Sequence, residues 1–430
     1  MSTATAMSDQ SLDLVDVRDR ASIARQIKLI VVFSIVVALL LFFALTINDS
    51  AVLYTLGERI SRENPAKEIN GQAVAWGAFV VAAVALVLAV LDRVPKGAWG
   101  AVIFVLVGVA FFTSFLVWNY ADQDLARPLA MVNPLPGTVR LATPLVFGAL
   151  AGVLCERSGV INIAIEGQLL MGAFFAAVAS SLAYSAEMGL VGGIIAGVAM
   201  AWMLGIFALR YQVNQVVLGV VLIAFASGLT AFMLSQIPND PDIKKYLNEP
   251  LVLERIPVPG LVDIPVLGPT LFNQSLLVYL MYASVVIVTF LLFETKWGLR
   301  VRSVGEHPKA ADTVGIKVNR VRWEAVLFGG VFAGLGGAYF TVGSTGSFDN
   351  DASAGNGFIA LAAVIMGRWH PVGATMAALF FGFTWTLQAQ LQVLDKIPGE
   401  LLRASPYLAT IIAVAGFVGR VRPPAADGEP

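Results

Sequence analysis

Long apolar runs recur along the chain, and they limit its fold more than any other feature. They lie at about residues 29–47, 72–91, 98–118, 138–155, 162–184, 188–209, 213–236, 275–293, 323–342, 372–391 and 405–420. A helix of about twenty apolar residues crosses the ~30 Å hydrocarbon core of a bilayer. Because lipid offers no hydrogen-bond partners, the backbone of such a run must satisfy itself within a helix. The sequence therefore predicts an all-α polytopic membrane protein.

Composition agrees with this fold class. Apolar residues make up 57% of the chain and charged residues 13%, against ~45–50% and ~25% in soluble domains, so a soluble domain is excluded. The net charge of −1 carries no information about nucleic acid, and the basic residues lie in short loops and form no single patch, so no nucleic acid is expected as a partner. Cys155 is the only cysteine. The chain can therefore form no internal disulfide or thiolate metal site, and no metal or other cofactor is expected.

The distribution of basic residues predicts on which side of the membrane each terminus of the chain lies. Arg18, Arg20, Arg25 and Lys28 precede the first run, so the positive-inside rule makes residues 1–28 a cytoplasmic tail. The most basic loop, 294–322, is separated from that tail by eight spans and should lie on the same side. Residues 421–430 are expected to form a second cytoplasmic tail.

Between the tails, the chain divides into two membrane regions. Residues 29–136 read as an N-terminal extension of three spans, and residues 137–420 as the core. Within the core, the ten apolar residues 358–367 are too few to cross a bilayer as a helix, so they predict a broken or re-entrant helix. The total is about 11–12 membrane segments. The runs 163–172 and 358–367 both end in an apolar-Met-Gly pattern, which fits a two-fold repeated core or chance similarity over ten residues.

One carboxylate lies deep inside an apolar run. Glu166 is followed by about twenty uncharged residues, and a charge at such depth costs roughly 2.5–3.5 kcal/mol on insertion scales. Glu166 should therefore face protein or a wet path and not lipid. Asn162 lies four residues earlier, which would place both side chains on one helix face. Gln168 would point elsewhere and should matter less.

Three stretches stand out as long motifs: E-R-S-G-V-I-N-I-A-I-E-G-Q-L-L-M-G-A-F from 156, V-G-E-H-P-K-A-A-D-T-V-G-I from 304, and G-N-G-F-I-A-L-A-A-V-I-M-G-R-W-H-P from 355. They resemble the permeases of bacterial ABC importers of the simple-sugar and nucleoside class, most closely its nucleoside branch. They occur in the family's order, so the resemblance covers about Pro136 to Arg420. Residues 1–130 carry no motif of this family.

The second of these stretches predicts a short helix in the basic loop. Pro308 suits a first helical position and Gly315 a C-terminal stop. A helix of two turns is unstable alone, so it either packs on its own spans or is held by another protein. The resemblance implies the second, a coupling helix that binds the ATPase subunit. Its residues would be His307, Pro308, Ala310, Ala311, Val314 and Gly315, with a small apolar face formed by Ala310, Ala311 and Val314.

The third stretch suggests a substrate path. The free N-terminal amides of a half-helix suit a polar, hydroxyl-bearing substrate, and Phe358 or Trp369 would either stack on a nucleobase or belong to the core. We expect the path to pass Asn162, Glu166, Asn356, Phe358 and Trp369.

The resemblance implies an importer permease that forms half of the path for a nucleoside or simple sugar in the bacterial plasma membrane. Its partners would be a second permease, an ATP-binding cassette subunit and an extracytoplasmic binding protein or lipoprotein, besides membrane lipid. The sequence contains no nucleotide-binding motif and no credible set of catalytic residues, so ATP hydrolysis would belong to the partner and the chain is not expected to be an enzyme. The alternative is an ion-coupled secondary carrier with a midplane site at the break 367–371.

Overall fold

The computed structural model describes residues 3–47, 51–55, 67–95, 97–121, 129–130, 134–237, 246–392, 398–401, 404, 408, 411 and 422–429. Ten helices within these ranges are long and apolar enough to cross a membrane, and an eleventh apolar helix is shorter. The run predicted at 405–420 lies largely outside the described residues. The chain is an all-α polytopic membrane protein, and it forms two compact units, Met1–Val132 with Val393–Ile397 and Asn133–Gln392 with Pro398–Pro430.

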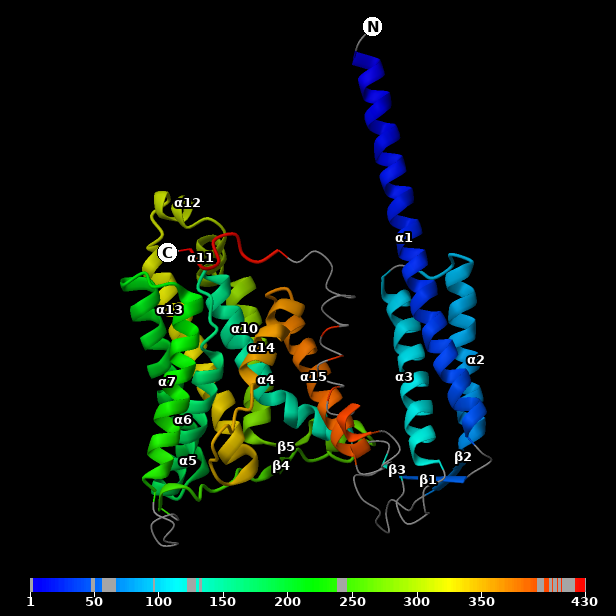
Figure 1. Cartoon of the computed structure of the whole chain (residues 1–430). Coiled ribbons are helices and arrows are strands. Elements are labelled where there is room, and N and C mark those ends of the chain that lie inside the picture. Colours follow the sequence, from blue (N-terminus) through cyan, green and yellow to red (C-terminus); the bar gives the residue numbers. More distant parts are fainter. Residues whose placement is uncertain are drawn as a thin grey trace. The chain divides into compact units, whose positions relative to one another are not determined.

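The first unit contains the three predicted N-terminal spans. They are α1 (Thr3–Thr46), α2 (Gly71–Val90) and α3 (Ala98–Tyr120), which pack side by side (Figure 1). Alanines recur every three or four residues on the buried face of α2, and this spacing follows the helical period. A small sheet that the sequence did not predict joins β1 (Ala51–Thr55) antiparallel to β2 (Lys67–Asn70) and parallel to β3 (Leu129–Ala130).

The second unit is the core. Its central helices are α4 (Pro134–Arg157), α5 (Ile165–Ala183) and α13 (Val318–Phe340), which are largely buried. Pro144 lies inside α4 without ending it. Around them lie α6 (Ala186–Gly205), α7 (Gln215–Ser235), α10 (Leu276–Glu294) and α15 (Pro371–Leu391), which keep more of their surface exposed. The short helix is α14 (Asn356–Met366), which packs on α4, α5 and α15.

Short irregular pieces complete the core. The π-helical turns η1 (Ile206–Arg210) and η2 (Thr341–Thr345) extend α6 and α13. Glycines let α6 and α13 approach closely, since a β-carbon at Gly197 would lie 2.6 Å from the Cα of Gly334. Small residues have this role at many membrane helix contacts.

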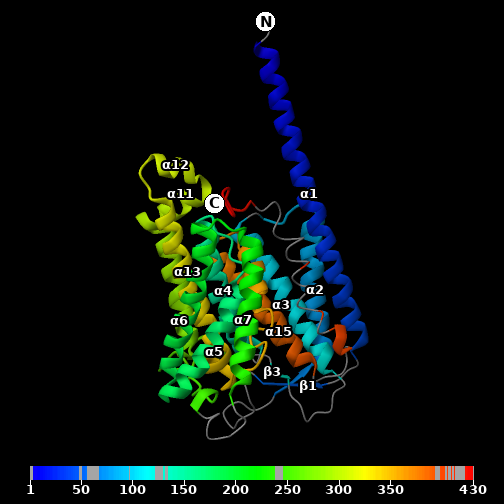
Figure 2. The same ribbon diagram turned by 60° about the vertical axis from the view of Figure 1, so that its left-hand side comes forward.

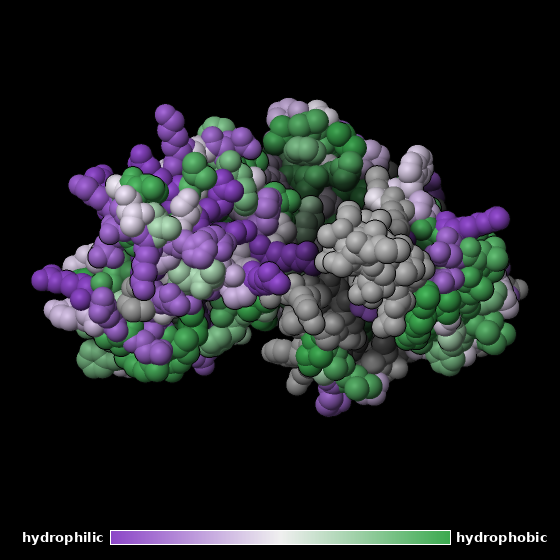
Figure 3. Space-filling model, turned by 90° about the horizontal axis from the view of Figure 1, so that it is seen from above, coloured by the Kyte–Doolittle hydropathy of each residue, from purple (hydrophilic) through white to green (hydrophobic). Residues whose placement is uncertain are grey.

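The two ends of the core differ. One end, here called the α12 end, carries α11 (Lys296–Glu306), α12 (Pro308–Thr313) and the C-terminal residues 422–429 (Figures 1 and 2). The opposite β4 end carries α9 (Leu267–Leu271) and the antiparallel pair β4 (Arg255–Pro257) and β5 (Asn273–Ser275). Seen from above, hydrophilic residues cover much of the α12 end (Figure 3).

Candidate functional site

Glu166 joins the start of α5 to the start of α14. Its carboxylate accepts hydrogen bonds from the Ser353 hydroxyl at 2.6 Å, the Gly355 N–H at 2.9 Å and the Gly357 N–H at 2.6 Å. The first amides of a helix have no partner within it, and the helix dipole favours negative charge there. Glu166 is therefore buried, as its position in an apolar run predicts, and it caps α14.

The prediction that Asn162 and Glu166 share one helix face is wrong. Asn162 precedes α5, which begins only at Ile165, so the two residues do not share helical spacing. The Asn162 amide instead donates to the Gln168 Oε1 at 3.1 Å and to the Cys155 Sγ at 3.5 Å. Gln168 is fully buried, and it is the partner of Asn162 that sequence reasoning set aside. The expectation of free amides at the start of α14 is also wrong, because Glu166 binds two of them.

Two neighbouring cavities of the core, here called the outer and the inner chamber of one candidate site, share three lining residues. The outer chamber measures about 280 Å³ and lies against β4 and β5. The inner chamber measures about 350 Å³ and is lined by residues of α4, α13, η2, α14 and α15. Arg140, Tyr339 and Ser344 line both chambers, so the two chambers adjoin at these side chains. Cavities of ~300–1,000 Å³ are typical of small-molecule sites.

Among the residues predicted for the substrate path, Asn356 lines this cavity and the other four do not. Phe358 is 50% exposed on the outside of α14. Trp369 is buried, and its indole N–H donates to the Glu156 carboxylate, so it belongs to the core. Sequence reasoning missed Arg140, Tyr339 and Trp385. A charge four residues before Pro144, in an otherwise apolar run, was the available signal for Arg140.

The break between α14 and α15 lies at the α12 end. Arg157, the last residue of α4, donates from Nε to the Trp369 carbonyl at 2.8 Å, and His370 stacks on Phe293 near the end of α10 at a ring distance of 4.6 Å. The turn thus lies level with the ends of α4 and α10. The midplane site expected for a secondary carrier at 367–371 is therefore wrong in position.

The predicted coupling segment forms α12, with Pro308 in its first turn and Gly315 two residues past its end. Ala310, Ala311 and Val314 were expected to share one exposed apolar face, and this expectation is wrong for Ala311. Ala311 is 4% exposed and packs against the core, whereas Val314 is 75% exposed and Ala310 is exposed. His307 is also exposed and, with Ala310 and Val314, lines a groove between α11 and α12.

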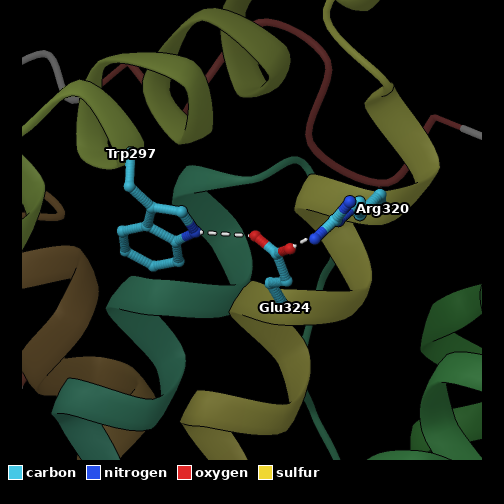
Figure 4. A network of polar contacts seen from close by, with 3 residues as sticks. All are labelled: Trp297, Arg320 and Glu324. Atoms are coloured by element: carbon cyan, nitrogen blue, oxygen red, sulfur yellow. Dashed lines mark hydrogen bonds and ion pairs between the residues drawn. The ribbon is translucent and has the colours of Figure 1, made fainter.

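A polar network attaches α11 to α13 (Figure 4). Glu324 of α13 accepts a hydrogen bond from the Trp297 Nε1 at 2.9 Å and one from the Arg320 Nε at 2.9 Å. Trp297 lies in the first turn of α11, so displacement of α11 would pull on α13. The same helix carries Tyr339 at the wall of the cavity. One helix therefore links the α12 end to the cavity.

The C-terminal residues pack on the α12 end beside α11. The Ala426 N–H donates to the Gly305 carbonyl at 2.9 Å, and the Gly428 N–H to the Gly159 carbonyl at 3.2 Å. Ala426 is buried. Burial raises the pKa of the Asp427 carboxyl to about 7, because a charged carboxylate is poorly solvated there. These residues thus connect α11 to the turn that follows α4.

Comparison with known proteins decides the family. The model of the branched-chain amino acid transport system permease component matches residues 136–418. The chain belongs to this family. It is 38% identical to the guanosine ABC transporter permease protein NupQ of Bacillus subtilis, over 72% of this chain and 98% of that protein. It is 36% identical to the nucleoside ABC transporter permease protein NupC of Lactococcus lactis, over 67% and 92%.

A more distant relative is the putative glucose ABC transporter permease protein TsgC13 of Haloferax volcanii, 32% identical over 66% of this chain and 92% of that protein. No solved structure matches the chain. The chain is a permease subunit of an ABC importer and a multi-pass membrane protein. Residues 1–132, which make up most of the first unit, lie outside the matched residues.

Proposed function

We propose that the chain forms half of the translocation path of a nucleoside importer. The carrying observation is its 38% identity to a guanosine permease over 98% of that protein, with a second nucleoside permease at 36%. The cavity supports this assignment, because its inner chamber combines an aromatic side chain, Trp385, with the polar groups of Asn356 and Arg140. A nucleoside likewise combines a flat base with a polar sugar.

The proposed assembly follows from the two ends of the core. The basic loop that contains α11 and α12 would lie in the cytoplasm, where the exposed Ala310 and Val314 would contact an ATP-binding cassette subunit. The N-terminus would be cytoplasmic as well. A second permease would complete the path, and an extracytoplasmic binding protein would deliver substrate at the β4 end, in a bacterial plasma membrane. ATP hydrolysis would belong entirely to the cassette subunit.

The test is uptake by cells that lack their own nucleoside transport and express this chain with its partner subunits. We expect uptake of radiolabelled guanosine and uridine, no uptake of glucose, and loss of uptake when the cassette subunit cannot hydrolyse ATP. Uptake should survive an ionophore that collapses ion gradients while ATP is maintained. Uptake of glucose but not of nucleosides would overturn the assigned substrate class. Uptake that is abolished by the ionophore and is independent of the ATPase would overturn ATP hydrolysis as the energy source.

A further inference from the structure

Asn356 lines the inner chamber and holds a buried hydrogen-bond acceptor that has no partner among the described residues. Its amide Nδ2 donates to the Ser353 carbonyl at 2.6 Å, and this bond fixes which end of the amide is oxygen. The side chain is 7% exposed and lines the inner chamber. Its Oδ1 is buried and has no hydrogen-bond partner among the described residues. A buried acceptor without a partner is costly, and a ligand that donates a hydrogen bond would remove that cost.

Glu166 fixes the backbone on both sides of this residue. The Gly355 N–H and the Gly357 N–H, one position before and one after Asn356, both donate to the Glu166 carboxylate. Ser353 donates its hydroxyl to the same carboxylate and accepts the Asn356 amide at its carbonyl. The orientation of Asn356 is thus determined by Glu166, although Glu166 itself does not line the cavity.

The other cavity walls narrow the class of ligand. Trp385, Phe340 and Pro144 give the inner chamber flat apolar surfaces, on which an aromatic base can stack. Arg140 lines both chambers and Arg255 lines the outer one, and no carboxylate among the described residues lines either. Among the described lining residues, neither chamber therefore offers a carboxylate that could pair with a cationic solute.

We infer that Asn356 contacts the substrate, accepting at Oδ1 an N–H or O–H from a neutral nucleoside whose base lies against Trp385, and that Glu166 is its positioning residue. The inference rests on the proposed function for the identity of the solute as a nucleoside. The inference assigns recognition to one acceptor, the Asn356 Oδ1. Removal of this oxygen and removal of the matching donor from the nucleoside should therefore weaken binding to the same extent.

The first experiment measures equilibrium binding of tritiated inosine to the assembled transporter in nanodiscs, with the binding protein left out. Asn356→Leu should weaken binding roughly threefold to tenfold, the usual effect of one neutral hydrogen bond. The matched control is Asn350→Leu, because Asn350 is exposed in the preceding loop, and it should bind like wild type. Equal binding by wild type and Asn356→Leu, including none by either, overturns the inference. Failure of the proposed function is distinct, since wild type would then show no nucleoside uptake with all its partners present.

The second experiment removes the donor and leaves the protein intact. N1-methylinosine, 2′,3′-dideoxyinosine and 5′-deoxyinosine together delete every N–H and O–H donor of inosine. One of them should bind wild type roughly threefold to tenfold more weakly than inosine, and this difference should vanish in Asn356→Leu. If wild type binds all three as tightly as inosine, or if the difference persists in the variant, Asn356 is not the contact.

The third experiment tests positioning by Glu166. Glu166→Gln keeps the shape of the side chain but has only one acceptor oxygen for two backbone amides and a hydroxyl, so it should weaken inosine binding. Combined with Asn356→Leu, it should cause no further loss, because both changes remove the same contact. Losses that multiply in the double variant would show that Glu166 acts independently of Asn356 and would overturn the positioning role.

Discussion

Glu166 and Gly357 are in contact so close that position 357 has no room for a side chain. The Gly357 N–H donates to the Glu166 Oε2 at 2.6 Å, and a β-carbon at Gly357 would lie 2.5 Å from the Glu166 Cα. The start of α14 can therefore reach the start of α5 only because residue 357 is glycine. This contact holds the cavity residue Asn356 in place.

Gly357→Ala should consequently destabilise the core. Overpacking of this kind costs about 1–3 kcal/mol, and here the obstacle includes backbone atoms that cannot rotate away. We expect a lower thermal unfolding temperature in detergent and a lower yield of monodisperse protein. The control is Gly108→Ala in α3, where a β-carbon meets open space and alanine favours the helix by roughly 1 kcal/mol. An unfolding temperature of Gly357→Ala equal to that of wild type would contradict this account of the contact.

Glu166→Leu should assemble poorly. It leaves the Ser353 hydroxyl and the two α14 amides without an acceptor, and each unpaired buried group costs about 1–3 kcal/mol. The readout is the yield and unfolding temperature of the purified transporter. Glu166→Gln retains one acceptor and should fall between Glu166→Leu and wild type. Equal yield and stability in all three proteins would show that the cap does not hold α14.

The sequence predicted the spans well because long apolar runs leave the backbone few alternatives. It also predicted that Glu166 is buried, since lipid would not accept a charge there. It could not name the partner of Glu166, because Ser353 lies 187 residues further along the chain and only the tertiary fold brings them together. Asn162 was misassigned for a local reason. The residues just before Ile165 are mostly apolar, so by composition they continue the run, but they are not helical.

The residues that line the cavity could not be predicted from the sequence for the same reason, because only the tertiary fold brings them together. Arg140, Tyr339 and Trp385 come from three different helices, and none belongs to a motif that indicates a site. Composition alone could not separate Ala311 from Ala310 either, although one faces the core and the other is exposed. Their difference depends on which side of α12 meets α11.

Substitutions on α12 should therefore have opposite consequences on its two faces. Ala310→Glu and Val314→Glu change exposed positions, so both should insert and express like wild type yet lose substrate-stimulated ATP hydrolysis by the assembled transporter. Ala311→Glu places a charge in the core and should lower expression instead. Co-purification of the cassette subunit and ATPase assays check this. Wild-type stimulation in both exposed variants would remove α12 from the coupling contact.

The packing of the C-terminal residues should depend on pH through Asp427. Burial raises the pKa of this carboxyl from 3.8 to about 7, so the packed tail holds the proton more tightly than a released tail does. Packing is then most favourable below about pH 4 and weakens as the pH rises towards 7. A spin label at Glu429→Cys reports this, because Glu429 is exposed and Cys155 is buried. We expect the label to be more mobile at pH 8 than at pH 5.

The decisive control is Asp427→Asn, which has the same shape without a charge at either pH. It should keep the label as immobile at pH 8 as at pH 5, because the backbone bonds of Ala426 and Gly428 to Gly305 and Gly159 remain. Equal mobility of the wild-type label at both pH values would show that Asp427 does not titrate in this range. A pH dependence that persists in Asp427→Asn would show that Asp427 is not the group that controls the packing of the tail.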